Sequence, residues 1–557
     1  MNRFIVAKTI LTLFFIICFF NNARSQNKNF KINGGLSATT IFYSAQGIEN
    51  RKNPFSYILS GNINISGYGV SLPFSFTLNN RKTRFNQPFN QFGMSPSYKW
   101  IKIHLGYRSL HFDPFILNGH KILGIGAELT PGILRLGFIY GRFKKESNKA
   151  HKINEIQTDS VQQFSRKGYA FKIGIGTKKS FLDFIFLNVS DDTLSLTNFN
   201  PKNTPLPSAN TAAGFNSHIR LSDMFTLKFN GAYSIYTNNL HASPLNIEFA
   251  VPKTFLSPLN SSTERYYAVK SSLTFKPAKQ FSLSANYKRI EPGYKSMGTY
   301  FMNSDAENYT FSTKIMMLKN KMNIKGSIGT EKNNLQTLRN ATTNKLIGSA
   351  NINYNPGRIF GINISYSNYS VNQKPGRIQI ADSVKLYQTN SSLIVMPHFQ
   401  FQGKNKKTNH FITVLYTKMG LKDKNPFTEN YTNFNVENIM LSYNLTFINL
   451  GFNIFSSFNY NTVEMSAGKS TNKGLTAGVS KSFINRKLNM SVSTTMMQSR
   501  NLTENTLTLT PSYNADYRIN KHNDFRIKLY LISNKNETDN TKSFNEKTVD
   551  FSYIFTF

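Results

Sequence analysis

Segments of about ten residues in which apolar and polar side chains alternate recur along the chain after residue 26. In residues 225–235 the odd positions are Phe, Leu, Phe, Gly, Tyr and Ile, and the even positions are Thr, Lys, Asn, Ala and Ser. The segments that begin at Phe281, Phe360 and Phe525 follow the same rule. Because successive side chains of a strand point to opposite faces, each segment predicts a strand with one apolar and one polar face.

The length of these segments favours a membrane-spanning barrel. A soluble β-sandwich or β-solenoid shows the same alternation, but its strands average only five or six residues. About ten residues cross a bilayer at a tilt, and Tyr and Phe gather near the segment ends as they do at membrane interfaces. Only a closed barrel spans lipid with strands and leaves no backbone group unpaired. The sequence therefore predicts an all-β, transmembrane antiparallel β-barrel.

The connections between segments alternate in length, which predicts short periplasmic turns and long extracellular loops. The short turns include residues 130–132, 277–278, 319–320, 355–357 and 484–486. The long polar stretches lie near residues 143–165, 190–210, 237–263, 291–305, 369–386 and 419–431. The long stretches are rich in Asn, Ser, Thr and Lys, as solvent-facing loops are.

The first residues carry an export signal. Arg3 and Lys8 precede an apolar run at residues 10–20, and Ala23-Arg24-Ser25 fits the small-x-small cleavage pattern. The apolar run is too short to span a bilayer as a helix. We expect a signal peptide at residues 1–25, an outer-membrane β-barrel domain at residues 26–557, and delivery to the outer membrane of a Gram-negative bacterium.

The last strand ends on an aromatic residue. Phe551, Tyr553, Phe555 and Phe557 share one face of this predicted strand. The pattern resembles the terminal strand that outer-membrane barrels present to the bacterial barrel-assembly machinery. The resemblance implies that these residues are a C-terminal assembly signal.

Counting strands by parity predicts about 24, with a range of 22 to 26, because both termini of such barrels are periplasmic. Residues 97–107 are an uncertain strand that either does not span or is joined by another short strand near residues 107–119. Residues 80–120 are also the segment most suited to constrict a wide lumen. The candidate constriction residues are Trp100, His104, Arg108, His111, Asp113 and His120.

The chain carries a formal charge of +38, and the signal peptide removes only Arg3, Lys8 and Arg24. Charged groups are costly on a lipid face, so basic residues on strands should face the lumen. Nine such residues form a candidate anion path: Lys102, Arg135, Lys172, Lys228, Lys270, Lys288, Lys325, Arg526 and Lys528. A basic lumen favours anions. The alternative is that the basic residues pair with lipopolysaccharide phosphates outside the barrel and face solvent in the loops. Nucleic acid is excluded as a partner because the chain leaves the cytoplasm.

Several stretches give the chain a family resemblance. They are residues 287–300 (YKRIEPGYKSMGTY), residues 303–309 (NSDAENY), Asn118-Gly-His120 and residues 128–132 (ELTPG). Together with an Asn-, Lys- and Ile-rich composition, they resemble uncharacterised outer-membrane β-barrel proteins of Bacteroidota, of flavobacterial type. The resemblance implies a barrel fold and brings no activity with it.

Motifs for catalysis or cofactor binding are missing. The spacing of His104, His111 and His120 fits no metal-ligand pattern, and the only cysteine, Cys18, lies in the signal peptide. We predict no enzyme activity, no metal and no cofactor. The leading hypothesis is a passive channel or binding barrel for polar, anionic solutes.

The alternative function is a non-conducting structural or assembly partner for a secreted or surface component, of the secretion, adhesion or gliding type. The expected partners are outer-membrane lipid and lipopolysaccharide, the assembly machinery during biogenesis and, for the alternative, another envelope protein.

Overall fold

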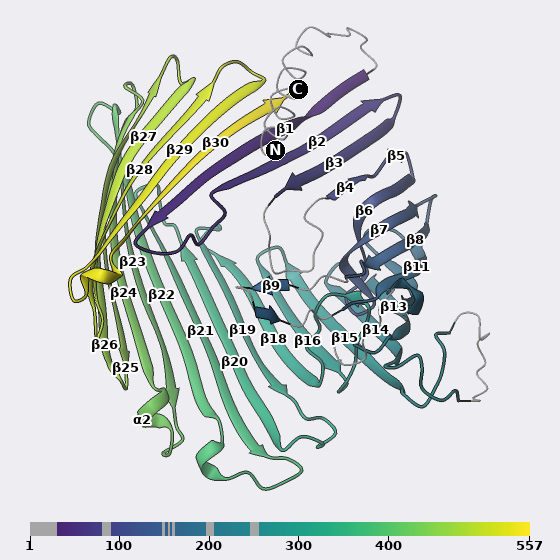
Figure 1. Cartoon of the computed structure of the whole chain (residues 1–557). Helices are drawn as coiled ribbons and strands as arrows, with labels where there is room; N and C mark the ends of the chain where they lie inside the picture. Colours follow the sequence, from purple (N-terminus) through teal and green to yellow (C-terminus); the bar gives the residue numbers. More distant parts are fainter. Residues whose placement is uncertain are drawn as a thin grey trace.

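The protein is a closed antiparallel β-barrel (Figure 1), seen in a computed structural model that describes residues 30–80, 91–147, 151–153, 156–158, 162–196, 205–245 and 256–557. The first strand, β1 (Phe30–Gln46), pairs with the last, β30 (Phe544–Thr556), from Gly35 opposite Thr556 to Gln46 opposite Asn545. In Figure 1 the wall runs from purple β1 through teal strands to yellow β30, which lies beside β1.

The wall contains 26 strands among the described residues, with β4 and β5 counted as one interrupted strand. Its first part is β2 (Phe55–Gly67), β3 (Val70–Asn79), β4 (Gln91–Met94), β5 (Ser97–Tyr98), β6 (Ile101–Asp113), β7 (Leu117–Leu129), β8 (Leu134–Lys144), β11 (Ser165–Gly176), β12 (Phe181–Asp192), β13 (Ala209–Arg220), β14 (Phe225–Thr237), β15 (Thr263–Ala278) and β16 (Phe281–Ile290). It continues with β18 (Ala306–Met317), β19 (Met322–Lys332), β20 (Ala341–Tyr354), β21 (Phe360–Pro375), β22 (Tyr387–Gln402), β23 (Thr408–Asp423), β24 (Phe434–Phe447), β25 (Phe452–Met465), β26 (Gly468–Phe483), β27 (Leu488–Arg500), β28 (Asn505–Arg518) and β29 (Asn523–Asn536).

Among the described residues, three short strands lie outside the wall: β9 (His151–Ile153) pairs with β10 (Ile156–Thr158), and β17 (Gly298–Thr299) pairs with β7. The helical elements in the same part of the chain are single turns in connections, namely η2 (Thr193–Ser195), η4 (Asp382–Val384), α2 (Glu429–Thr432) and η5 (Asn540–Lys542). In the described part of the chain, no helix has the length and apolar character needed to cross a membrane.

The two ends of the barrel differ as predicted. Turns such as residues 68–69, 279–280 and 318–321 join strands at the end where β1 begins and β30 stops, whereas residues 376–386 and 424–433 make longer connections at the other end. At the turn after β18, Leu318, Lys319 and Asn320 all have positive φ, which closes the hairpin tightly.

The strand count lies at the upper limit of the predicted range, and the difference comes from residues 91–113. The uncertain strand at 97–107 is shifted to β6 at Ile101–Asp113, and the extra strand is β4 with β5 rather than a segment near 107–119. Pro96 separates β4 from β5 because proline has no backbone N–H to donate to the sheet. The Pro96 carbonyl still accepts a hydrogen bond from the Ile103 amide at 2.8 Å.

Each strand presents two different faces. On β8, Leu134, Phe138 and Tyr140 are exposed, whereas the residues between them include the buried Gly137 and Ile139. On β24, the exposed Leu441 follows Met440 and precedes Ser442, which belong to the opposite face. A continuous exposed apolar face on a closed barrel suits lipid, so we take this face as the outer one and the other as the lumen wall.

The predicted signal peptide at residues 1–25 lies outside the described residues. The predicted assembly signal lies on β30, at the seam of the barrel. The Phe551 ring lies 6.1 Å from the ring of Phe42 on β1, and the Phe555 and Phe557 rings lie 5.5 Å apart. The role of these residues in assembly stays a prediction.

The assignment of faces can be tested on β24. Leu441→Arg places a charge on the outer face, which should lower the free energy of unfolding in lipid vesicles by about 2–4 kcal/mol, the cost of Arg at the bilayer midplane. Ser442→Arg, one residue later on the lumen face, should change it by less than about 1 kcal/mol, as substitutions away from packed features do. Urea titration of vesicle-embedded protein measures both. Equal losses would contradict the assignment.

Candidate functional site

The tip of the β6–β7 hairpin (residues 110–119, the tip) lies on the lumen wall. The Asp113 carboxylate accepts hydrogen bonds from the amides of Phe115 at 2.7 Å and Ile116 at 3.2 Å. Its other oxygen accepts a hydrogen bond from the Asn230 amide group on β14 at 3.0 Å. Asp113 is buried, and these hydrogen bonds offset part of the cost of removing its charge from water. One side chain thus shapes the turn and holds it against a distant strand.

The connection between β16 and β18 (residues 291–305, the inner loop) folds onto the tip. Gly298 and Thr299 of β17 pair in parallel with Leu117–Gly119. The Ser296 hydroxyl donates to the Ile116 carbonyl at 2.7 Å, and the Tyr294 hydroxyl donates to the Phe115 carbonyl at 3.2 Å. Burial raises the pKa of Tyr294, which keeps this hydroxyl protonated as a donor. The tip and the inner loop together form one body, the inner plug.

An apolar core joins the inner plug to the wall. From the tip come Leu110, Phe112, Phe115, Ile116 and Leu117, and from the inner loop come Tyr294 and Met297. The wall contributes Ile122, Ile139, Phe143, Ala170, Ile185, Leu187, Val189, Ala212, Ala232, Ala268 and Ile290. Each fully buried large aliphatic side chain contributes about 1.5–3 kcal/mol. The inner plug is therefore a packed structure that covers the part of the lumen wall of β7–β16 nearer the longer connections and leaves the part nearer the short turns open.

Asn210 on β13 anchors the inner loop. Its side-chain oxygen accepts from the Met297 amide at 3.1 Å, and its nitrogen donates to the Ser234 hydroxyl at 2.7 Å. The Ser234 hydroxyl in turn donates to the Lys295 carbonyl at 2.7 Å. Asn210 is fully buried, so these bonds satisfy a group that would otherwise be costly there.

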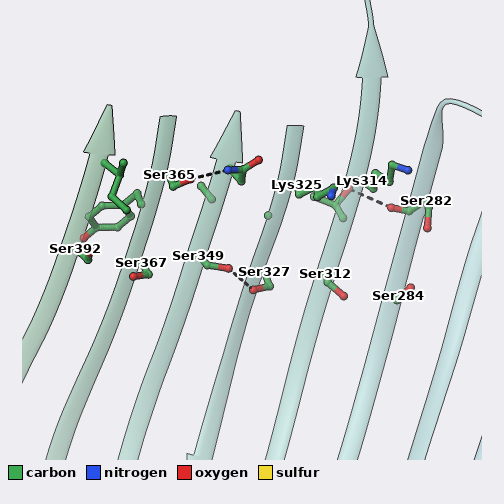
Figure 2. Close-up of a pocket in the computed structure, with 16 residues that line it drawn as sticks. Ser282, Ser284, Ser312, Lys314, Lys325, Ser327, Ser349, Ser365, Ser367 and Ser392 are labelled. Carbon is green, nitrogen blue, oxygen red and sulfur yellow. Dashed lines mark hydrogen bonds between the residues drawn. The ribbon is translucent and has the colours of Figure 1, made fainter. Parts of the chain in front are cut away.

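The remaining wall is polar and open. Eight hydroxyl residues stand directly opposite one another on adjacent strands from β14 to β22 (the hydroxyl row): Thr226, Thr274, Ser284, Ser312, Ser327, Ser349, Ser367 and Ser392. Figure 2 shows six of the serines side by side on the strands. Ser327 and Ser349 share a hydrogen bond at 2.7 Å, and Thr274 and Ser284 share one at 2.9 Å. A groove of about 550 Å³ lies along this row.

Lysines border the hydroxyl row. Lys314 stands directly opposite Lys325, and both line the groove, one step towards the short-turn end (Figure 2). On the other side of the row, Lys270 stands opposite Lys288, and Lys228 stands opposite Ser272. No ion pair to an acidic residue is recorded for these five lysines within the described chain. Like charges opposite one another are destabilising in a sheet unless anions or water screen them.

The nine basic residues predicted from the sequence fall into two groups. Lys228, Lys270, Lys288 and Lys325 belong to the open group just described. The others have acidic neighbours: Arg135 pairs with Asp183 at 2.7 Å, Arg526 pairs with Asp516 at 2.9 Å, and Lys102 and Lys172 lie 3.8 and 3.9 Å from Glu128. Lys528 stands opposite Asp550 in the sheet. Arg135 and Arg526 are therefore paired locally, whereas Lys102 and Lys172 share the single charge of Glu128 and Lys528 forms no ion pair within the described chain.

The six candidate constriction residues do not form one site. His111, Asp113 and His120 lie on or beside the tip, where His111 contacts Asn118 at 2.9 Å. His104 lies within the wall between Ser95 and Glu128, and Arg108 donates to Ser75 at 3.2 Å. Trp100 lies at the start of β6, the end opposite the tip, and is 44% exposed. Within the described ranges, no group of three or more His, Cys, Asp or Glu is arranged to hold a metal ion.

The sequence reasoning missed three features: Lys314, the hydroxyl row and the packing of residues 291–305 against the tip. Lys314 has the same parity as Ser312 on β18, so alternation was enough to find it. The hydroxyl row depends on the pairing register between strands, which no single segment displays. Residues 287–300 carry part of the family resemblance, but their contact with Asn118 and Gly119 has no signature in either segment.

Comparisons with known proteins return distant structural likenesses. No protein-family model and no curated protein matches the chain. Similar solved structures include OccAB2 of Acinetobacter baumannii, at 12% identity and a TM-score of 0.33, over 95% of this chain and 98% of that one. The FrpB iron transporter of Neisseria meningitidis is 11% identical with a TM-score of 0.40, over 95% of this chain and 83% of that one. The siderophore receptor PirA of Pseudomonas aeruginosa is 8% identical with a TM-score of 0.39, over 94% of this chain and 80% of that one. Likenesses this low assign no function.

The packing of the inner plug predicts the effect of a single glycine substitution. A Cβ at Gly298 would lie 2.1 Å from the Ile116 carbonyl oxygen, so Gly298→Val should separate the inner loop from the tip. We expect faster deuterium uptake at residues 291–305 by hydrogen-exchange mass spectrometry. Gly357→Val is the matched control, because nothing lies within 4 Å of a Cβ there. Unchanged uptake in Gly298→Val would contradict the docking.

Proposed function

We propose that the protein is an outer-membrane barrel that lets polar, anionic solutes pass through its lumen passively. The observation that carries the proposal is the set of five lumen lysines, Lys228, Lys270, Lys288, Lys314 and Lys325, on a wall that the inner plug leaves open. The location in an outer membrane is supported by the closed wall and its apolar outer face, since only closed barrels span lipid with strands.

The sign of the charge supports anions over cations. An unpaired lysine within a confined lumen lowers the energy of a passing anion and raises that of a cation. The opposed pair Lys314 and Lys325 concentrates this effect on one level of the wall. Salt screens such charges over about 8–10 Å, so the preference should weaken as ionic strength rises.

The hydroxyl row supports passage of polar solutes rather than tight binding. Each serine or threonine can both donate and accept, and the row offers these groups at the same level across adjacent strands. A solute that leaves water can exchange its hydrogen bonds along such a row. Conduction requires sites that are weak and repeated rather than a single strong one.

A second candidate function is a non-conducting structural partner for an exported or surface component. The inner plug favours it, because a packed core over β7–β16 stabilises one side of the barrel without serving passage. Lipopolysaccharide, the assembly machinery and another envelope protein stay proposed partners. Co-purification of a stoichiometric protein from native membranes, together with a closed barrel in planar bilayers, would favour this candidate.

Charge reversal in the lumen tests the channel. Lys314→Glu/Lys325→Glu should lower the anion-to-cation permeability ratio severalfold, read from the reversal potential of a planar bilayer under a salt gradient. Reversing Lys404 and Lys407, exposed lysines of the short turn at residues 403–407, makes the same charge change outside the groove.

The control should keep most of the wild-type preference. A barrel that conducts no current, or a preference that both double variants change equally, would refute the proposal.

A further inference from the structure

A second cavity, of about 630 Å³, lies between the inner plug and the wall of β8 and β11. The cavity lies towards the end of the barrel with the longer connections, because its lining includes Lys144, the last residue of β8, and Tyr236, the next to last of β14. Its lining also includes Lys121 from β7 and most of residues 295–300 from the inner loop. Its volume is in the range of pockets that hold small molecules.

The lining is strongly basic. Six of its residues are Lys or Arg and none is acidic, counting the described residues that line it. Arg166 is neutralised by Asp191 in a two-point ion pair, at 2.7 and 3.1 Å. Lys144 stands directly opposite Arg166 in the sheet, and among the described residues it forms no ion pair of its own with a carboxylate. Lys145 and Lys295 add two exposed ammonium groups.

Aromatic groups and a buried histidine also line the cavity. The rings of His120 and Tyr300 stack at 4.3 Å, and the Lys295 ammonium lies 5.1 Å from the Tyr236 ring. His120 is 8% exposed, and its Nδ1 is buried with no hydrogen-bond partner in the structure. A buried polar atom without a partner is uncommon, and the Nδ1 of His120 offers a hydrogen-bonding position to a ligand in this cavity.

We propose that this cavity (the vestibule site) binds a small polyanion bearing phosphate or carboxylate groups before it passes along the open wall. Because Asp191 neutralises Arg166, Lys144 is the wall cation that marks where the anionic groups sit, and Lys145 and Lys295 add ammonium groups from the connection after β8 and from the inner plug. His120 supplies one hydrogen bond through its Nδ1. The later passage of the solute along the open wall rests on the proposed function, whereas binding at the vestibule site does not require that the barrel conducts.

The test is equilibrium binding to the full-length barrel in detergent, measured by isothermal titration calorimetry with pyrophosphate and, separately, citrate. The wild-type protein should bind at least one of them saturably at one site, more weakly as salt is raised. Lys144→Gln/Lys295→Gln should weaken this binding at least tenfold. Lys145→Gln alone, at an exposed position, should weaken the binding of the anion about threefold, which corresponds to about 0.7 kcal/mol. This single variant tests the proposal if the double variant does not fold.

The matched control is Lys314→Gln/Lys325→Gln, which removes two lysines from the groove and none from the vestibule site. It should leave the affinity within about twofold of wild type, because neither lysine lines the vestibule site and no contact with the bound anion is removed. No saturable binding of either anion to wild type, or equal losses in the control and vestibule variants, would overturn the proposal. Binding of pyrophosphate but not citrate would support a phosphate-bearing ligand, and binding of citrate but not pyrophosphate would support a carboxylate-bearing one. Saturable binding to a barrel that shows no anion preference in planar bilayers would support the vestibule site and refute the channel.

Discussion

Backbone pairing is the interaction on which the whole structure depends. In lipid, every amide and carbonyl of a strand needs a partner within the protein, and a sheet provides one at both edges only when it closes. The register from Gly35–Thr556 to Gln46–Asn545 makes that closure between the first and last strands. Once the wall is closed, alternation divides each strand between lipid and lumen, so outer and inner chemistry can change independently.

Closure with 26 strands creates a second requirement, because a lumen of that width is not filled by wall side chains. The chain fills part of it with its own connections. The tip and the inner loop bring backbone groups into the lumen, where Asp113 and Ser296 bond those of the tip and Asn210 bonds the Met297 amide of the inner loop. The apolar core then makes the inner plug a fixed part of one side. What is left on the other side is a wall of hydroxyls and lysines, and the asymmetry of the lumen follows from where the inner plug packs.

The sequence predicted the wall well because a strand's two faces are encoded by neighbouring residues. Alternation placed Lys228, Lys270, Lys288 and Lys325 on the lumen side, and parity allowed a total of 26 strands but placed the extra strand near residues 107–119 instead of at β4 and β5. The sequence alone could not predict that Asp183 neutralises Arg135, because that pair depends on how β8, β11 and β12 lie together. It also missed the inner plug, since Ser296 and Ile116 are 180 residues apart and loop contacts have no period.

The division of the lumen into a covered and an open side is the central claim, and cysteine labelling tests it most directly. Cys18, the one cysteine of the chain, lies in the predicted signal peptide, so Ser349→Cys and Ala232→Cys place single thiols on two levels of the lumen wall. A membrane-impermeant maleimide should label Ser349→Cys rapidly, because the hydroxyl row is open to solvent, and Ala232→Cys at least tenfold more slowly, because the inner plug covers it. Equal labelling rates in folded protein would contradict the account.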